Sequence, residues 1–102
     1  MKFEYSYEVS REDARARLEA LGDYLNNRHG INASWTEEYK GRFTGKYMMV
    51  TIDGELDIQE GKVNFSGKDP GMLLRKRAIK YLKGKLATYL DPNTPIEQLP
   101  RG

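Results

Sequence analysis

The segment VTIDGELDIQ, residues 50–59, carries the clearest pattern in the chain and decides its fold class. Val, Ile, Gly, Leu and Ile occupy every second position, and polar residues occupy the positions between them. Because successive side chains of a β-strand point to opposite faces, this alternation predicts a strand with one face on the core and the other in water. Such a strand is typical of an antiparallel sheet. Gly54 inside so regular a strand also predicts a bulge or a sharp bend.

The segments around this strand extend the sheet to about five strands. Residues 60–61, Glu-Gly, are typical of a two-residue hairpin, and the alternation resumes over residues 63–65 on the return strand. Alternation over residues 3–7 and 31–36 predicts two further strands, and another strand from about Arg42 follows a polar turn. Short connections favour a meander in which neighbours in sequence pair in the sheet.

A first helix is predicted over residues 11–29. Ser10 stands at the N-cap position with Asp13 three residues later, a near match to a capping box. Gly30 suits the left-handed residue just past a helix end. Arg17 is among the charged residues expected on the exposed side of this helix. The apolar stripe that should face the sheet consists of Ala14, Leu18, Leu21 and Leu25.

A second helix is predicted over about residues 70–90. Asp69 and Pro70 have the residue types of an N-cap and a first helical residue, because proline pre-sets the backbone angle and lacks an N–H that would have no partner there. Its apolar stripe consists of Ala78, Ile79, Leu82, Leu86, Tyr89 and Leu90.

These elements predict an α+β fold in the order β-α-β-β-β-β-α, with an antiparallel sheet of about five strands and two helices packed on one face. A chain of 102 residues has room for one core, so residues 1–91 are expected to form a single α+β domain. Residues 92–102 are expected to form a loose C-terminal tail. Within this tail Thr94, Pro95 and Glu97 favour one short helical turn that would lay Ile96 or Leu99 on the body.

The composition excludes several kinds of site. The chain has no cysteine, so a disulfide, a thiolate metal site and a cysteine nucleophile are excluded. His29 is the only histidine, which excludes a histidine-based zinc cluster. Asp53, Glu55 and Asp57 point the same way from one strand and are expected to be its wet side rather than a cation site. We therefore expect no catalytic residues, no metal and no cofactor, and a protein that acts by binding rather than as an enzyme.

The same features favour the cytoplasm. Absence of cysteine is typical of a reducing compartment. The N-terminal sequence MKFEYSYEVS lacks the apolar core of a signal peptide, and no apolar run approaches the roughly 20 residues that a transmembrane helix needs.

Three segments carry a resemblance to a known family: RHGINASW at residues 28–35, TIDGELDI at residues 51–58, and KDPGMLLRKRAIKYLKGKLATYLDP at residues 68–92. In this order they resemble the polyhydroxyalkanoic acid system family, over Phe3 to about Pro92. The resemblance implies a small bacterial protein with a role at or near polyester granules, and it brings no functional residues. The residues that carry it are residues of fold: Gly30, Trp35, Gly54, Leu56, Asp69, Pro70, Gly71, Leu74 and Leu82.

The second predicted helix is strongly basic. No acidic residue stands between Pro70 and Leu90, so this segment has a charge of +6 and the rest of the chain, with a net charge of +2, has −4. A basic helix face suits binding to phosphate, to anionic lipid or to an acidic partner. A solvated face without a partner is the alternative. The cations are Arg75, Lys76, Arg77, Lys80, Lys83 and Lys85.

An apolar run, Tyr47, Met48, Met49 and Val50, breaks the alternation where two strands should join. An exposed apolar patch here suits adsorption on a hydrophobic granule or a homodimer interface. The alternative is that both faces of the strand are buried, one by the helices and the other by another subunit or a loop.

Three binding hypotheses follow. The first is a non-enzymatic protein of the polyhydroxyalkanoate family that binds a hydrophobic or anionic surface, such as a granule or a granule protein. The second is a nucleic-acid or ribosome-associated protein whose basic helix contacts phosphates. The third is a carrier of a small apolar ligand, with a cavity under the second helix lined by residues such as Trp35, Phe43, Ile52 and Phe65. The surface residues predicted to bind are Arg75, Lys76, Arg77, Lys80, Lys83, Tyr47, Met48 and Met49.

Overall fold

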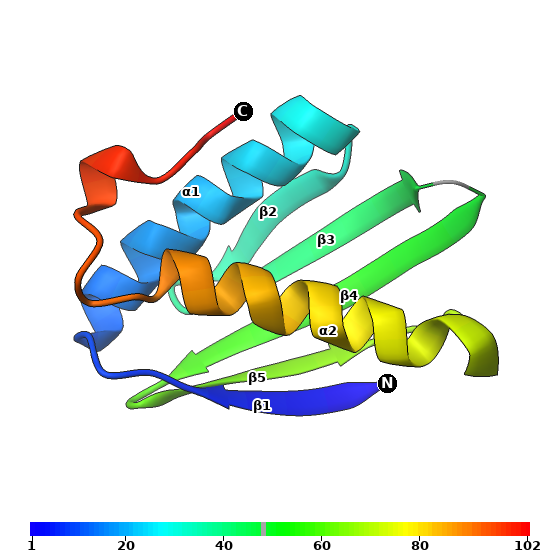
Figure 1. Ribbon diagram of the computed structural model, residues 1–102, viewed down its shortest axis with the longest axis horizontal. Coiled ribbons are helices and arrows are strands. Elements are labelled where there is room, and N and C mark those ends of the chain that lie inside the picture. The colour runs from blue at the N-terminus through cyan, green and yellow to red at the C-terminus, as the bar shows by residue number, and fades with distance from the viewer. Residues whose placement is uncertain (48) are drawn as a thin grey trace.

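The computed structural model describes residues 1–47 and 49–102 and places two helices on one face of a five-stranded antiparallel sheet (Figure 1). This arrangement confirms the predicted α+β fold and the order of its elements. The helices are α1 (Arg11–His29) and α2 (Met72–Tyr89), and a 3-10 turn follows at Ile96–Gln98. The strands are β1 (Lys2–Ser6), β2 (Asn32–Glu37), β3 (Lys40–Tyr47), β4 (Val50–Gln59) and β5 (Lys62–Gly67).

The strand order in the sheet is β1-β5-β4-β3-β2, so the last four strands form the predicted meander and the first strand pairs with the last. In β4, Leu56 and Ile58 are buried under the helices, whereas Asp53 and Glu55 are exposed on the other face. The alternation of apolar and polar residues over residues 50–59 therefore corresponds to the two faces of the sheet, one on the core and one exposed to solvent. None of the helices among the described residues is long and apolar enough to cross a membrane.

Helix α1 begins and ends as predicted. The backbone N–H of Asp13 donates to the Ser10 hydroxyl at 3.1 Å, and Gly30 closes the helix in the left-handed conformation with φ 67°. Its apolar stripe is buried in the core.

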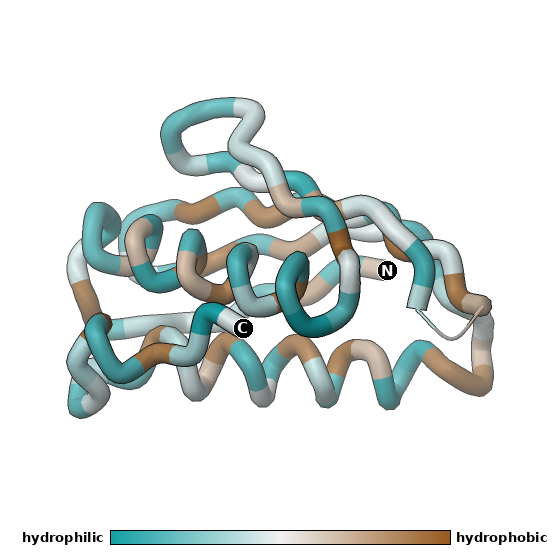
Figure 2. The backbone as a smooth tube through the Cα atoms, turned by 90° about the horizontal axis from the view of Figure 1, so that it is seen from above, coloured by the Kyte–Doolittle hydropathy of each residue, from teal (hydrophilic) through white to brown (hydrophobic). Residues whose placement is uncertain are grey.

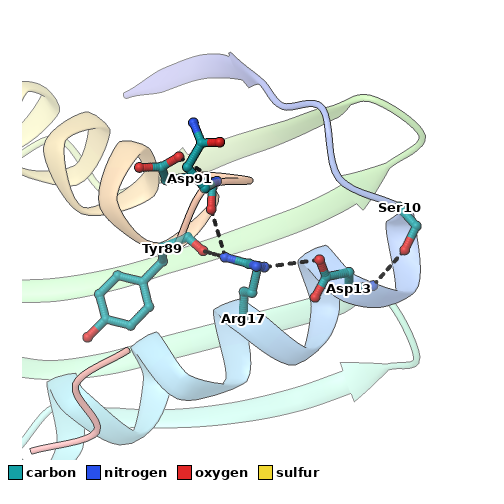
Figure 3. A network of polar contacts seen from close by, with 6 residues as sticks. Ser10, Asp13, Arg17, Tyr89 and Asp91 are labelled. Carbon is teal, nitrogen blue, oxygen red and sulfur yellow. Dashed lines mark hydrogen bonds and ion pairs between the residues drawn. The ribbon is translucent and has the colours of Figure 1, made fainter. Parts of the chain in front are cut away.

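Arg17 contradicts the expectation of an exposed charged side chain. It is only 5% exposed, and its guanidinium donates to the Asp13 carboxylate at 3.1 Å and to the backbone oxygens of Tyr89 and Asp91 at 3.2 and 2.9 Å (Figure 3). The two carbonyls lie where α2 ends and therefore lack helical partners. Arg17 thus joins α1 to the C-terminal end of α2.

The start of α2 differs from the prediction by two residues. The helix begins at Met72 with Gly71 as its N-cap. The Asp69 carboxylate accepts a hydrogen bond from the Gly71 N–H at 2.9 Å, which holds residues 69–71 in a turn outside the helix. Arg75 also pairs with Asp69. The Arg75 guanidinium, followed by the Gly71 N–H, lowers the pKa of the Asp69 carboxyl.

Gly54 does not mark the predicted bulge. Strand β4 pairs with β3 in continuous register through this residue, its pairing with β5 runs in register from Gly54 to Gln59, and the register shift of the sheet lies between Trp35 and Glu37. A Cβ atom at Gly54 would lie 2.9 Å from the Phe65 ring and 3.5 Å from the Phe43 ring. The glycine is therefore needed because two aromatic rings pack directly over its Cα.

A matched pair of substitutions tests this role. Gly54→Ala should lower the free energy of unfolding by about 1–3 kcal/mol, since the added methyl group overpacks the core. Gly84→Ala should raise it by about 0.5–1 kcal/mol, since Gly84 lies inside α2 and its added methyl group would meet no atom within 4 Å. Urea unfolding of both variants measures the two values. A Gly54→Ala protein as stable as the wild type, or more stable, would show that ring packing does not require Gly54.

The C-terminal tail packs against the helices, so the expectation of a loose tail is wrong. The predicted short turn forms at Ile96–Gln98, and it places Leu99, only 5% exposed, in the core. The Tyr89 hydroxyl donates to the Pro100 oxygen, and burial raises the pKa of Tyr89 to about 12, so this donor stays protonated even in alkaline solution. Arg101 pairs with Asp23 at 2.7 Å.

Candidate functional site

A groove of about 530 Å³ lies between α2 and the sheet. It opens at the end of the molecule where the tips of β3 and β4 and the start of α2 lie. Most of its lining is apolar or aromatic. The lining residues include Leu25 and His29 of α1, Phe43 and Tyr47 of β3, Ile52 of β4, Phe65 of β5, and Leu74, Ala78, Tyr81 and Leu82 of α2.

The groove exists because α2 is anchored at one end. Its C-terminal part is held by Leu86 and Tyr89, which are 2% and 1% exposed. Its first residues, Met72 and Leu73, are 83% and 92% exposed, so this end extends past the core. Figure 1 shows the two helices close together at the C-terminal end of α2 and diverging toward its N-terminal end. Ala78 adds little side-chain volume where they diverge.

Aromatic rings form the wall on the α1 side. The His29 ring meets the Tyr47 ring edge-on, with centroids 5.0 Å apart. The Lys85 ammonium lies 4.3 Å from the Tyr24 ring centroid and 5.7 Å from that of Tyr81. Burial raises the pKa of the Tyr81 hydroxyl, and the hydroxyls of Tyr24 and Tyr47 add to this shift. His29, Tyr47 and Tyr81 therefore give the groove an aromatic wall, which Tyr24 supports from behind the lining.

The charged side chains on the groove lining are mainly cationic. Lys68 and Arg77 line it, and no carboxylate among the described residues lies within ion-pair distance of either. Asp53 also contributes to the lining, but its carboxylate pairs with Arg42 at 3.0 Å. Strand alternation places that carboxylate on the wet face, away from α2. The groove lining thus contains two cations without an ion-pair partner among the described residues and one carboxylate, which is already paired.

The cations predicted on α2 do not share one face. Arg77 lines the groove, and Arg75 is paired with Asp69. Lys76, Lys80 and Lys83 recur at the helical period and lie on the opposite flank, since the Lys83 ammonium is 5.6 Å from the ring centroid of Phe3 in β1. The basic helix of the sequence is thus divided between the groove and the β1 edge.

The predicted apolar run lies at the mouth of the groove. Tyr47 is 45% exposed and lines the groove, and Met49 is 99% exposed with φ 70°. Met48 lies outside the described residues. Tyr47 and Met49 are therefore exposed in the single chain.

Three further exposed residues, Met72, Leu73 and Leu74, belong to the same end and were missed. Figure 2 shows hydrophobic segments at the β3–β4 tips and at the start of α2 on one side of the molecule. Together with Tyr47 and Met49 they form what we call the apolar end. The sequence did carry a signal for this exposed surface. Three consecutive apolar residues precede the apolar stripe of α2, and a single helix face cannot bury all three.

The residues suggested for a ligand cavity are largely confirmed as groove residues. Phe43, Ile52 and Phe65 line the groove. Trp35 does not line it, and its ring instead lies under the Arg15 guanidinium, 3.8 Å from the ring centroid. Among the described residues, no three His, Asp or Glu side chains gather so as to hold a metal ion.

Comparison with known proteins gives one match. No curated protein and no solved structure matches the chain. The model of a family described as "Putative polyhydroxyalkanoic acid system protein" matches residues 1–93, which include all five strands and both long helices. The chain therefore belongs to this polyhydroxyalkanoic acid system family.

Proposed function

We propose that the protein is a non-catalytic binding protein of the bacterial cytoplasm that attaches to the surface of polyhydroxyalkanoate granules. The observation that carries this proposal is the apolar end. Met49, Met72 and Leu73 are 83–99% exposed, although they come from segments more than 20 residues apart in the chain. Exposed apolar side chains grouped in this way mark interaction surfaces. Membership of the polyhydroxyalkanoic acid system family indicates which surface the apolar end would contact, namely that of a hydrophobic polyester granule.

The physical basis is burial of apolar side chains in the granule surface. Full burial of a Met or Leu side chain contributes roughly 1.5–3 kcal/mol, so three of them supply roughly 4.5–9 kcal/mol, which corresponds to attachment between about the millimolar and the micromolar range. Lys76 and Lys80 follow within about two turns of the start of α2 and would add attraction to anionic groups on the same surface.

Purified protein mixed with protein-free polyhydroxybutyrate granules and separated by centrifugation tests the proposal. We expect the granules to retain the wild-type protein. The triple variant Met49→Ser, Met72→Ser, Leu73→Ser should bind at least tenfold more weakly, because about 1.4 kcal/mol corresponds to tenfold and each substitution removes part of the buried apolar area.

The matched control is the double variant Ala33→Ser, Ala87→Ser, which changes exposed apolar positions outside the apolar end. It should bind like the wild type, and circular dichroism should show all three proteins folded. A wild-type protein that stays in the supernatant, or a triple variant that binds as well as the wild type, would remove the proposal.

A further inference from the structure

We propose that the groove under α2 binds one molecule of an anionic amphiphile, an acyl chain that ends in a carboxylate. The acyl chain would lie in the groove, and the carboxylate would lie at Arg77 and Lys68. The volume of about 530 Å³ falls in the range of roughly 300–1,000 Å³ that small-molecule sites occupy. This site shares Tyr47 and Leu74 with the apolar end, but Met49, Met72 and Leu73, which carry the proposed granule contact, do not line the groove.

The floor of the groove suits an alkyl chain. It is formed by Leu25, Ile31, Phe43 and Phe65, each at most 9% exposed, so the groove reaches the core of the domain. A water molecule in such a place finds few polar groups to bind, whereas a chain of methylene groups removes further apolar area from water. Ala78 is the small side chain of α2 that leaves this space open.

The mouth selects the charge of the ligand. Arg77 and Lys68 lie on the lining without an acidic partner among the described residues, as shown above. The two nearby carboxylates are already paired, that of Asp53 with Arg42 and that of Asp69 with Arg75. A ligand carboxylate would thus receive charge-assisted hydrogen bonds, and an arginine guanidinium can give it two in parallel.

The same charges disfavour a second copy of the chain as the occupant. In a two-fold dimer closed over the groove, each subunit would bring the same cationic mouth to the contact. Juxtaposed like charges of this kind oppose association. A single negatively charged small molecule satisfies both the apolar floor and the cations.

Isothermal titration calorimetry at pH 8 with dodecanoate tests the site, with 1-dodecanol and dodecyltrimethylammonium as ligands of equal chain length and different charge. We expect one dodecanoate per chain, and at least tenfold weaker binding of the other two ligands. Arg77→Gln should weaken dodecanoate binding about tenfold and leave 1-dodecanol unchanged. Lys80→Gln, the same change on the opposite flank of α2, should stay within twofold of the wild type.

Ala78→Trp, which fills the groove, should abolish binding of dodecanoate. The triple serine variant of the apolar end should still bind it, which separates this site from the granule contact. Binding of many dodecanoate molecules per chain, equal affinity for the cationic ligand, no heat of binding, or equal effects of Arg77→Gln and Lys80→Gln would each overturn the proposal. Analytical ultracentrifugation is a further test. A dimer that does not dissociate when dodecanoate is added would also overturn the proposal.

Discussion

Replacing Arg17 with methionine should lower the free energy of unfolding by about 1–3 kcal/mol, measured by urea denaturation, since the Asp13 carboxylate left behind is 38% exposed and water can solvate it. The guanidinium is almost fully buried, and it donates to the Asp13 carboxylate and to the backbone oxygens of Tyr89 and Asp91. Methionine fills much of the volume but donates no hydrogen bond. The carboxylate and two carbonyls then lose their charged donor, and the Tyr89 carbonyl is in a buried position where water cannot replace it.

The matched control is Arg42→Met. Arg42 pairs with Asp53 and Glu55 on the wet face of the sheet, and its side chain is 45% exposed. Such pairs contribute about 0–1 kcal/mol, since solvent screens the charges and replaces the lost hydrogen bonds. If both variants lose the same stability, the buried network at Arg17 is no stronger than a surface ion pair, and the link between α1 and α2 must come from apolar packing alone.

The contrast between the two arginines also shows which structural features cannot be predicted from the sequence. The fold class followed from local patterns, because the alternation over residues 50–59 and the cap at Ser10 each depend on neighbours within a few positions. Arg17 carries no such local signal. It is buried only because the end of α2, some 70 residues later, presents two unpaired carbonyls to it.

The candidate site shows the same division. Tyr47 and Met49 were found from a local break in alternation, and Arg77 from the charge of its segment. Tyr47 and Arg77 line one groove because α2 packs on the sheet. No local sequence pattern specifies this packing. The division of the α2 cations between two flanks has the same cause, since the apolar stripe is wide and the rotation of the helix is fixed by its contacts with β1 and α1.

Deleting residues 94–102 should lower the free energy of unfolding by about 2–4 kcal/mol, although these residues lie beyond the part of the chain that matches the family. Leu99 is 5% exposed in the core, and truncation of such a leucine removes transfer energy and leaves a cavity. The Tyr89 hydroxyl also loses its acceptor at Pro100. Urea denaturation of the shortened chain measures the loss.

Two point variants decide which contact of the tail matters. Leu99→Ala should account for most of the loss, about 2–3 kcal/mol, because the core contact depends on this one side chain. Arg101→Ala should cost less than about 1 kcal/mol, because its pair with Asp23 is half exposed on both sides. A shortened chain as stable as the full one would mean that the tail is loose in solution, as its proline-rich, polar sequence predicts, and that residues 1–93 bury their core without it.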